Sequence, residues 1–110
     1  MNLSDKMKLL VFVSPGCPHC PAAESVARRV APEYNEFGLY FKKVRTRTDE
    51  GKRLSSMYRI MATPTILLVN DEGEEKKRIV GTPSESSLKN EIEKALGLKK
   101  SFFGKIFGKK

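Results

Sequence analysis

The stretch Cys17-Pro18-His19-Cys20 lies between an apolar run, Leu9–Val13, and a segment with the periodicity of an amphipathic helix. It contains the only two cysteines of the 110-residue chain. Two intervening residues let both thiols share one helical turn, close enough to form a reversible disulfide. Backbone N–H groups at a helix N-terminus carry partial positive charge and favour thiolate over thiol. The pattern is therefore typical of a thiol–disulfide redox protein.

The same two cysteines have two other interpretations. A CxxC motif can be half of a zinc site, which needs four ligands, but His19 lies inside the pair and cannot easily bind the same metal. Because the chain has no other Cys or His, only two chains together could complete such a site. The pair could also be an inert structural disulfide, although these are rare in the cytoplasm. No metal is expected for the redox interpretation.

The composition fits one globular domain, with 39% hydrophobic and 31% charged residues. The run Leu9–Val13 is too short for a signal-peptide core, and no segment has the length of a membrane span, so the cytoplasm is the expected compartment. The net charge of +8 is uneven, because residues 97–110 hold five lysines and no acidic residue. Residues 1–96 are only mildly basic and lack the motifs of nucleic-acid-binding proteins, so nucleic-acid binding is not expected.

Four strands are expected, at residues 9–13, 39–48, 65–69 and 75–80. The second is rich in Lys and Arg, which is typical of a strand at the edge of a sheet. The first connection crosses over between parallel strands, and the third and fourth strands form a hairpin. We therefore expect an α/β fold with a four-stranded mixed sheet, order 2-1-3-4, and helices on both faces.

Three helices are expected between these strands. The first begins near Pro18, a residue well suited to a first helical turn, and must kink or end at Pro32. The last begins with a capping box formed by Thr82 and Glu85, and it stops at Gly97. In the second helix, the side chains expected to face the core are Leu54, Met57 and Tyr58. In the third helix, they are Leu88, Ile92 and Leu96.

With the dithiol after the first strand and Ala62-Thr63-Pro64-Thr65 before the third, residues 8–97 resemble the thioredoxin fold. The details resemble most closely the small archaeal-type thioredoxins, also called glutaredoxin-like. Three segments carry this resemblance: residues 12–23 around the dithiol, residues 58–65, and Gly81-Thr82-Pro83. The resemblance implies a monomeric protein-disulfide oxidoreductase that needs no cofactor, acts on disulfide-bearing proteins, and is recharged by an unidentified reductase.

The resemblance also implies roles for individual residues. Cys17 is expected to be the attacking thiolate and Cys20 the resolving thiol. Thr63–Pro64 is expected to be a cis peptide bond, with the backbone of Thr63 pairing with a substrate strand; the alternative is a trans proline that simply opens a strand. Gly81 matches the small residue beside the site, but it could equally be a plain strand terminator.

Pro18 and His19 are the residues expected to tune the thiolate. The dipeptide also occurs in the strongly oxidising periplasmic disulfide oxidase of bacteria, so an oxidase or isomerase is the alternative to a reductase. His19 could instead be an exposed spacer. A second alternative, of another class, is a non-enzymatic docking module whose dithiol is incidental.

The chain departs from related families at three points. Gly16 stands where larger thioredoxins have Trp, and Val11 stands where they have a buried Asp that assists the second cysteine. The segment that begins at Gly81 lacks the glycine pair with which glutaredoxins bind glutathione, so glutathione use is not expected.

Residues 98–110 are expected to form a basic amphipathic tail outside a thioredoxin-like domain of residues 1–97. As a helix, the tail would place four large apolar side chains on one face: Phe102, Phe103, Ile106 and Phe107. Such a segment is typical of contact with a membrane surface or a partner protein. It could also pack on its own domain or stay unstructured.

Overall fold

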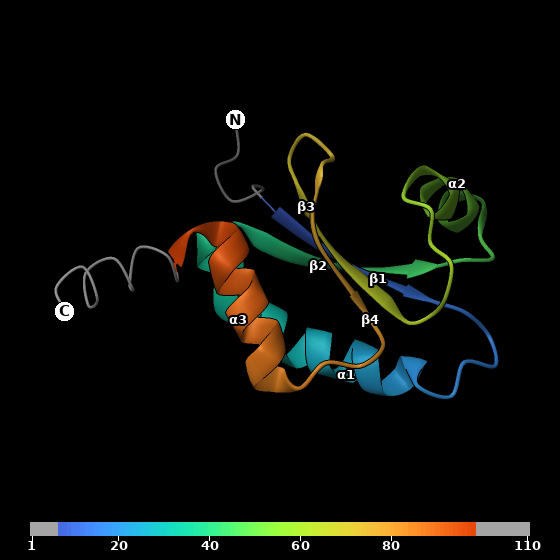
Figure 1. The fold of residues 1–110 in the computed structure, drawn as a ribbon, viewed down its shortest axis with the longest axis horizontal. Helices are drawn as coiled ribbons and strands as arrows, with labels where there is room; N and C mark the ends of the chain where they lie inside the picture. Colours follow the sequence, from blue (N-terminus) through green and yellow to red (C-terminus); the bar gives the residue numbers. More distant parts are fainter. Residues whose placement is uncertain (1–6, 99–110) are drawn as a thin grey trace, which may run out of the picture.

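The computed structural model describes residues 7–98, which contain one mixed sheet (Figure 1). Its strands are β1 (Met7–Val13), β2 (Leu39–Arg45), β3 (Thr65–Asn70) and β4 (Glu75–Val80), in the order β2-β1-β3-β4. Strand β1 pairs parallel with β2 and antiparallel with β3, and β4 pairs antiparallel with β3. The predicted order, with the first strand inside the sheet and the basic second strand at its edge, is confirmed.

Helices cover both faces of this sheet, as predicted. Helices α1 (Cys20–Val30) and α3 (Glu85–Leu96) lie against one face, and α2 (Asp49–Met57) lies on the other (Figure 1). The larger core cluster joins α1 and α3 to the sheet, and the smaller one lies under α2. A 3-10 helix, η1 (Ala31–Phe37), follows α1 and ends at a left-handed Gly38.

Helix α1 begins two residues later than the sequence predicts. His19 is its N-cap and Cys20 its first residue, so Pro21 rather than Pro18 occupies the first turn. Proline is tolerated there because the N–H it lacks would have no acceptor within the helix. Cys17 and Pro18 therefore lie in the turn that precedes the helix.

The start of α3 also differs from the prediction. Its N-cap is Ser84, whose hydroxyl accepts a hydrogen bond from the Ser87 N–H at 3.1 Å, and Glu85 is the first helical residue. The predicted capping box of Thr82 and Glu85 is therefore wrong. Both Thr82 and Ser84 are good caps by residue type, and only the path of the chain after β4 selects between them.

Two further predictions need correction on the α2 side. Strand β2 ends at Arg45, three residues early, because the chain turns there to enter α2. Met57 is 59% exposed, whereas Leu54, Tyr58 and Ile60 pack against the smaller core cluster.

In α3, Leu88 and Ile92 are fully buried as predicted, and Leu96 packs at the edge of the larger cluster.

Within residues 7–98, no helix has the length and apolar character needed to cross a membrane. The predicted amphipathic tail lies outside the described residues, except for Leu98, which packs against the larger core cluster.

Candidate active site

Cys17 and Cys20 form a disulfide at the end of the sheet where β1 leads into α1, with their Cα atoms 5.4 Å apart. Cys20 is 5% exposed and belongs to the larger core cluster. Cys17 is half-buried and lies at the edge of that cluster. The two sulfurs are therefore unequal in access, and Cys17 is the one that faces solvent.

The start of α1 offers fewer free backbone donors than the motif alone suggests. The Cys20 N–H donates to the Cys17 carbonyl at 3.3 Å, and the Ala23 N–H donates to the His19 carbonyl at 3.2 Å. Pro21 has no N–H at all. Three of the first four residues of the helix therefore have no N–H to offer to an anion at this end.

The loop before β3 packs beside the disulfide turn. Thr63–Pro64 is a cis peptide bond, as the resemblance implied, and Pro64 is buried. The Thr63 hydroxyl lies 2.7 Å from the hydroxyl of Ser14, in the turn that carries the cysteines. This hydrogen bond joins two segments that are 49 residues apart in the chain.

A third segment, after β4, closes the site. The Gly81 N–H donates to the Pro64 carbonyl at 2.9 Å, and the Thr82 hydroxyl donates to the His19 carbonyl at 3.2 Å. Gly81 has a φ of +100°, which a residue with a side chain rarely adopts. Hydrogen bonds thus join the segments that hold Thr63–Pro64 and Gly81 to the turn that carries the cysteines, while Pro18 lies exposed in that turn.

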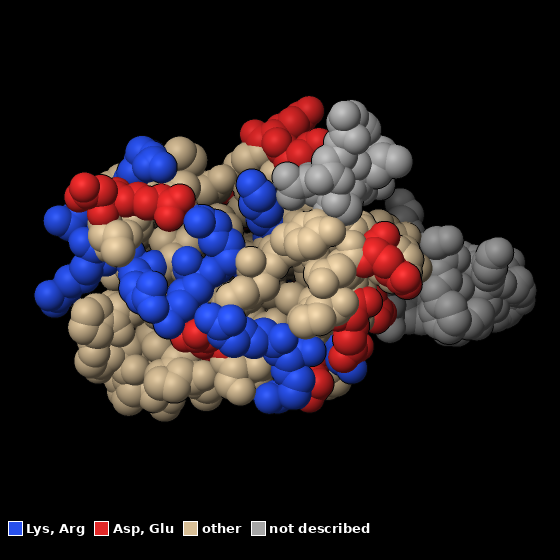
Figure 2. Space-filling view, turned by 180° about the vertical axis from the view of Figure 1, so that it is seen from behind, with Lys and Arg blue, Asp and Glu red and all other residues tan. Residues whose placement is uncertain are grey.

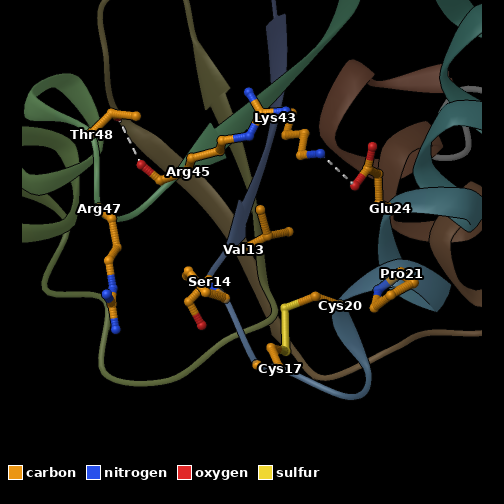
Figure 3. A pocket seen from close by; sticks show the side chains of 12 residues that line it. Val13, Ser14, Cys17, Cys20, Pro21, Glu24, Lys43, Arg45, Arg47 and Thr48 are labelled. Atoms are coloured by element: carbon orange, nitrogen blue, oxygen red, sulfur yellow. Dashed lines mark hydrogen bonds and ion pairs between the residues drawn. A yellow bond between two sulfur atoms is a disulfide. The ribbon is translucent and has the colours of Figure 1, made fainter.

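A pocket of about 400 Å³ lies between the disulfide and the end of β2 (Figure 3). Its apolar lining includes Val13, Pro15 and Pro21, together with the two cysteines. Its charged lining is formed by Lys43, Arg45, Arg47 and Glu24. The sequence predicted that these cations protect an edge strand, and it did not predict the pocket. The alternation of Leu39, Phe41, Lys43 and Arg45 along β2 was the available signal.

Among residues 7–98, Glu24 is the one carboxylate that lines this pocket, and it lies one helical turn after Cys20. It accepts from Arg28 at 2.9 Å and pairs with the Lys43 ammonium at 3.1 Å. Burial raises its pKa, but the hydrogen bonds from Arg28 and Lys43 outweigh burial and hold the pKa below its usual value. Val11, by contrast, is fully buried among apolar side chains, so no carboxylate lies at the position that larger thioredoxins use.

No cluster of three Cys, His, Asp or Glu side chains with the spacing of metal ligands occurs in the part of the chain that the structure describes. The chemistry visible at this site is that of the two cysteines.

A CxxC pair between a central strand and a helix, beside a cis-proline loop on a 2-1-3-4 sheet, defines a thiol–disulfide oxidoreductase of thioredoxin fold. The family model described as thioredoxin matches residues 1–94. The thioredoxin of Methanocaldococcus jannaschii is 35% identical over 91 residues, which cover 83% of this chain and 98% of that protein. A probable thioredoxin of Archaeoglobus fulgidus is 38% identical over 91 residues, with 83% and 89% covered.

A solved structure agrees with these relatives. A single-site mutant of a thioredoxin from Halobacterium salinarum superposes with a TM-score of 0.71 at 28% identity, over 84% of this chain and 76% of that one. The chain belongs to the thioredoxin family, and the predicted resemblance to archaeal thioredoxins is confirmed.

Proposed function

We propose that this protein is a reductase of protein disulfides in which Cys17 is the nucleophile and Cys20 the resolving thiol. The observation that carries the assignment is the difference in access, because Cys17 is half-buried at the surface and Cys20 is 5% exposed. An incoming disulfide can meet only the outer sulfur, and the inner one can act only within the mixed disulfide.

The electron and proton balance is that of two exchange steps. The Cys17 thiolate attacks one sulfur of the substrate disulfide, forms a mixed disulfide and releases the first substrate thiolate. Cys20 then loses its proton to solvent, and its thiolate attacks the Cys17 sulfur and releases the second substrate thiolate. The two released thiolates take up protons from solvent according to their pKa values. The product is the Cys17–Cys20 disulfide, and two electrons have passed to the substrate. An upstream reductase, still to be identified, returns the pair to the dithiol without a bound cofactor in this chain.

Thr63, Pro64 and Gly81 are proposed to position the substrate. The hydrogen bonds that join Ser14 to Thr63 and Gly81 to Pro64 hold this loop against the disulfide turn, which supports the proposal. In this position, the backbone of Thr63 is available to an extended substrate chain that crosses the disulfide. The fold supplies the geometry for strand addition to an exposed backbone.

Pro18 and His19 are proposed to tune the Cys17 thiolate. His19 is exposed at the N-cap of α1 and contributes no side-chain cap, so its imidazole is available to the neighbouring sulfur. Stabilisation of the thiolate favours the dithiol and raises the reduction potential. This effect favours the alternative function, an oxidase or isomerase, and the direction of electron flow is therefore the property to test.

We propose a cytoplasmic monomer that takes part in electron transport to protein disulfides and does not bind nucleic acid. The division into a domain of residues 1–97 and a tail of residues 98–110 is part of the same proposal. The tail's five lysines and four large apolar residues favour contact with an anionic membrane surface or a partner protein. Binding to anionic vesicles that is lost on deletion of residues 98–110 would support membrane contact, and no binding at low salt would exclude it.

Reduction of insulin disulfides with dithiothreitol as electron donor tests the proposed function. The wild-type protein should accelerate insulin precipitation, and Cys17→Ser should leave only the rate of the donor alone. A wild-type protein that does not accelerate the reaction, with its dithiol shown to be reduced, would favour the docking module with an incidental dithiol.

A further inference from the structure

The cations beside the disulfide occupy positions where the sheet would otherwise continue its apolar face. Along β2, Leu39 and Phe41 point into the core under α1, and the next two positions on that face are Lys43 and Arg45. Arg45 lies opposite Val13 in the parallel register, at the last pair before β1 leads into the cysteine turn. The strand therefore changes from apolar to cationic where it reaches the redox site.

The backbone that carries Arg45 and Arg47 is fixed by local hydrogen bonds. The Arg45 carbonyl accepts from both the N–H and the hydroxyl of Thr48, at 3.1 and 2.8 Å. The Thr46 N–H donates to the Val13 carbonyl at 2.9 Å. Gly51 lies in contact with the Arg45 carbonyl, where a Cβ would clash, so α2 packs directly on this turn. The two arginines thus project from a preorganised segment.

These charges are not used within the described part of the chain. Neither Arg45 nor Arg47 has a carboxylate within 4.0 Å among residues 7–98, whereas Lys43 pairs with Glu24. Figure 3 shows the disulfide at one end of the pocket, Lys43 and Arg45 toward the other, and Arg47 along one side. Figure 2 shows a band of Lys and Arg across the face on the other side of the molecule from that in Figure 1.

We propose that Lys43, Arg45 and Arg47 form a subsite for carboxylates of the substrate polypeptide, so that the protein prefers disulfides flanked by Asp or Glu. The subsite lies in the pocket beside the Cys17–Cys20 disulfide, so a chain in mixed disulfide with Cys17 passes it within a few residues. Arg45 and Arg47 are exposed, so their interactions with a bound carboxylate are those of exposed ion pairs and are weakened by salt. The preference rests on the proposed reductase function and names its substrate class.

A pair of matched peptides tests the preference. Each peptide contains one intramolecular disulfide, flanked either by two Glu or by two Gln, and kcat/KM is measured for both at low ionic strength with dithiothreitol recycling. Exposed ion pairs contribute about 0.2–1 kcal/mol each, so we expect a three- to tenfold preference for the Glu peptide. The preference should fall sharply at 1 M salt, where the Debye length is about 3 Å.

Two double variants, each of which removes two positive charges, distinguish an effect of the subsite from an effect of the protein's net charge. Arg45→Gln with Arg47→Gln should bring the ratio of the two kcat/KM values close to one. Arg53→Gln with Lys76→Gln, at exposed positions outside the pocket, should keep the wild-type ratio. The conservative pair Arg45→Lys with Arg47→Lys should retain most of the preference, and circular dichroism checks that every variant folds.

Three results would overturn the proposal. The first is a wild-type protein that reduces both peptides equally. The second is an equal loss of preference in both double variants, which would assign the effect to net charge. The third is oxidised glutathione reduced as well as the Glu peptide and equally dependent on Arg45 and Arg47, because the subsite would then serve a small anionic disulfide.

The failure of the reductase function itself gives a different result. In that case neither peptide is reduced, but the disulfide form of the protein oxidises the reduced peptides. The Glu-to-Gln ratio of the oxidation rates, measured with the same variants, then tests the subsite, and equal rates for the two peptides overturn it.

Discussion

The two sides of the Cys17–Cys20 disulfide are built differently. On the β3 side, the cis-proline loop is neutral and is held by hydrogen bonds to Ser14 and Gly81. On the β2 side, the described residues that line the pocket include three cations and one carboxylate, which pairs with one of the cations. Under the two proposals above, the neutral side offers backbone groups that fit any extended chain, whereas the charged side responds to the substrate's side chains. We therefore assign the binding of any extended chain to one side of the disulfide, and the discrimination between substrates by their side chains to the other.

The largest expected effect comes from replacing either cysteine. The two variants should behave differently, because the two cysteines have different proposed roles. Cys20→Ser should accumulate a stable mixed disulfide with a peptide substrate, because no resolving thiol remains. Cys17→Ser should form none, since the remaining sulfur is buried. Intact mass spectrometry after incubation with the oxidised peptide measures both. Adduct formation on Cys17→Ser, with none on Cys20→Ser, would reverse the assignment.

Glu24→Gln removes the carboxylate from the charged side and should change both stability and preference. The pKa of Glu24 is below its usual value of 4.5, so its ionised form stabilises the folded state above about pH 4.5. That contribution is lost as pH falls through the lower folded-state pKa. We expect the variant to lose about 1 kcal/mol of unfolding free energy at pH 7 and less near pH 3, because Glu24 becomes protonated as the pH falls.

The same variant frees Lys43 from its ion pair, so the preference for Glu-flanked peptides should increase about twofold. Urea denaturation at the two pH values and the peptide assay measure the two effects. Glu33→Gln, on η1 and paired with Lys89, is a matched control that should leave the peptide preference unchanged. A stability loss of equal size at both pH values would contradict the role of ionisation.

Ser14→Ala acts on the neutral side, where it removes the hydrogen bond to the Thr63 hydroxyl. Both hydroxyls are part-buried, and one such bond contributes about 0.5–1.5 kcal/mol. Because the loop is loosened for every substrate, kcat/KM should fall about two- to fivefold for the Glu and the Gln peptide alike. A change in the ratio of the two peptides would show that the two sides are not independent.

His19→Gly is expected to have the smallest effect. If the imidazole stabilises the Cys17 thiolate, the variant should have a lower reduction potential, by about 10–20 mV for an exposed interaction that solvent screens. Equilibration with a glutathione buffer at pH 7 measures the change. An unchanged potential would leave His19 as a spacer between the cysteines.

The sequence predicted the sheet and the disulfide because their signals are local. Each signal lies within a few residues: an apolar run of strand length, a CxxC pair, and a proline before a buried strand. The hairpin turn also predicted the bounds of β4 correctly. Helix starts were less well predicted, because Pro18 and Pro21, or Thr82 and Ser84, satisfy the same local rules. The choice between them is made by the contacts of the chain on either side.

The charged pocket has only a weak local signal, the change from Leu39 and Phe41 to Lys43 and Arg45 along one face of β2. Lys43 and Arg45 are ordinary residues for an edge strand, and the residues that face them across the pocket come from distant parts of the sequence. The parallel pairing of Val13 with Arg45 brings them to the disulfide, and α1 supplies Glu24 to one cation only. The prediction that Met57 is buried was wrong for a related reason, because a short helix can turn either face toward the sheet.

The reduction potential of the Cys17–Cys20 pair tests the proposed direction of electron flow most directly. It is measured by equilibrating the protein with glutathione or thioredoxin couples at pH 7 and quantifying the dithiol and disulfide forms. A protein-disulfide reductase should lie near the thioredoxin value of about −270 mV. A value of about −120 mV, which is typical of a strong periplasmic oxidant, would contradict it.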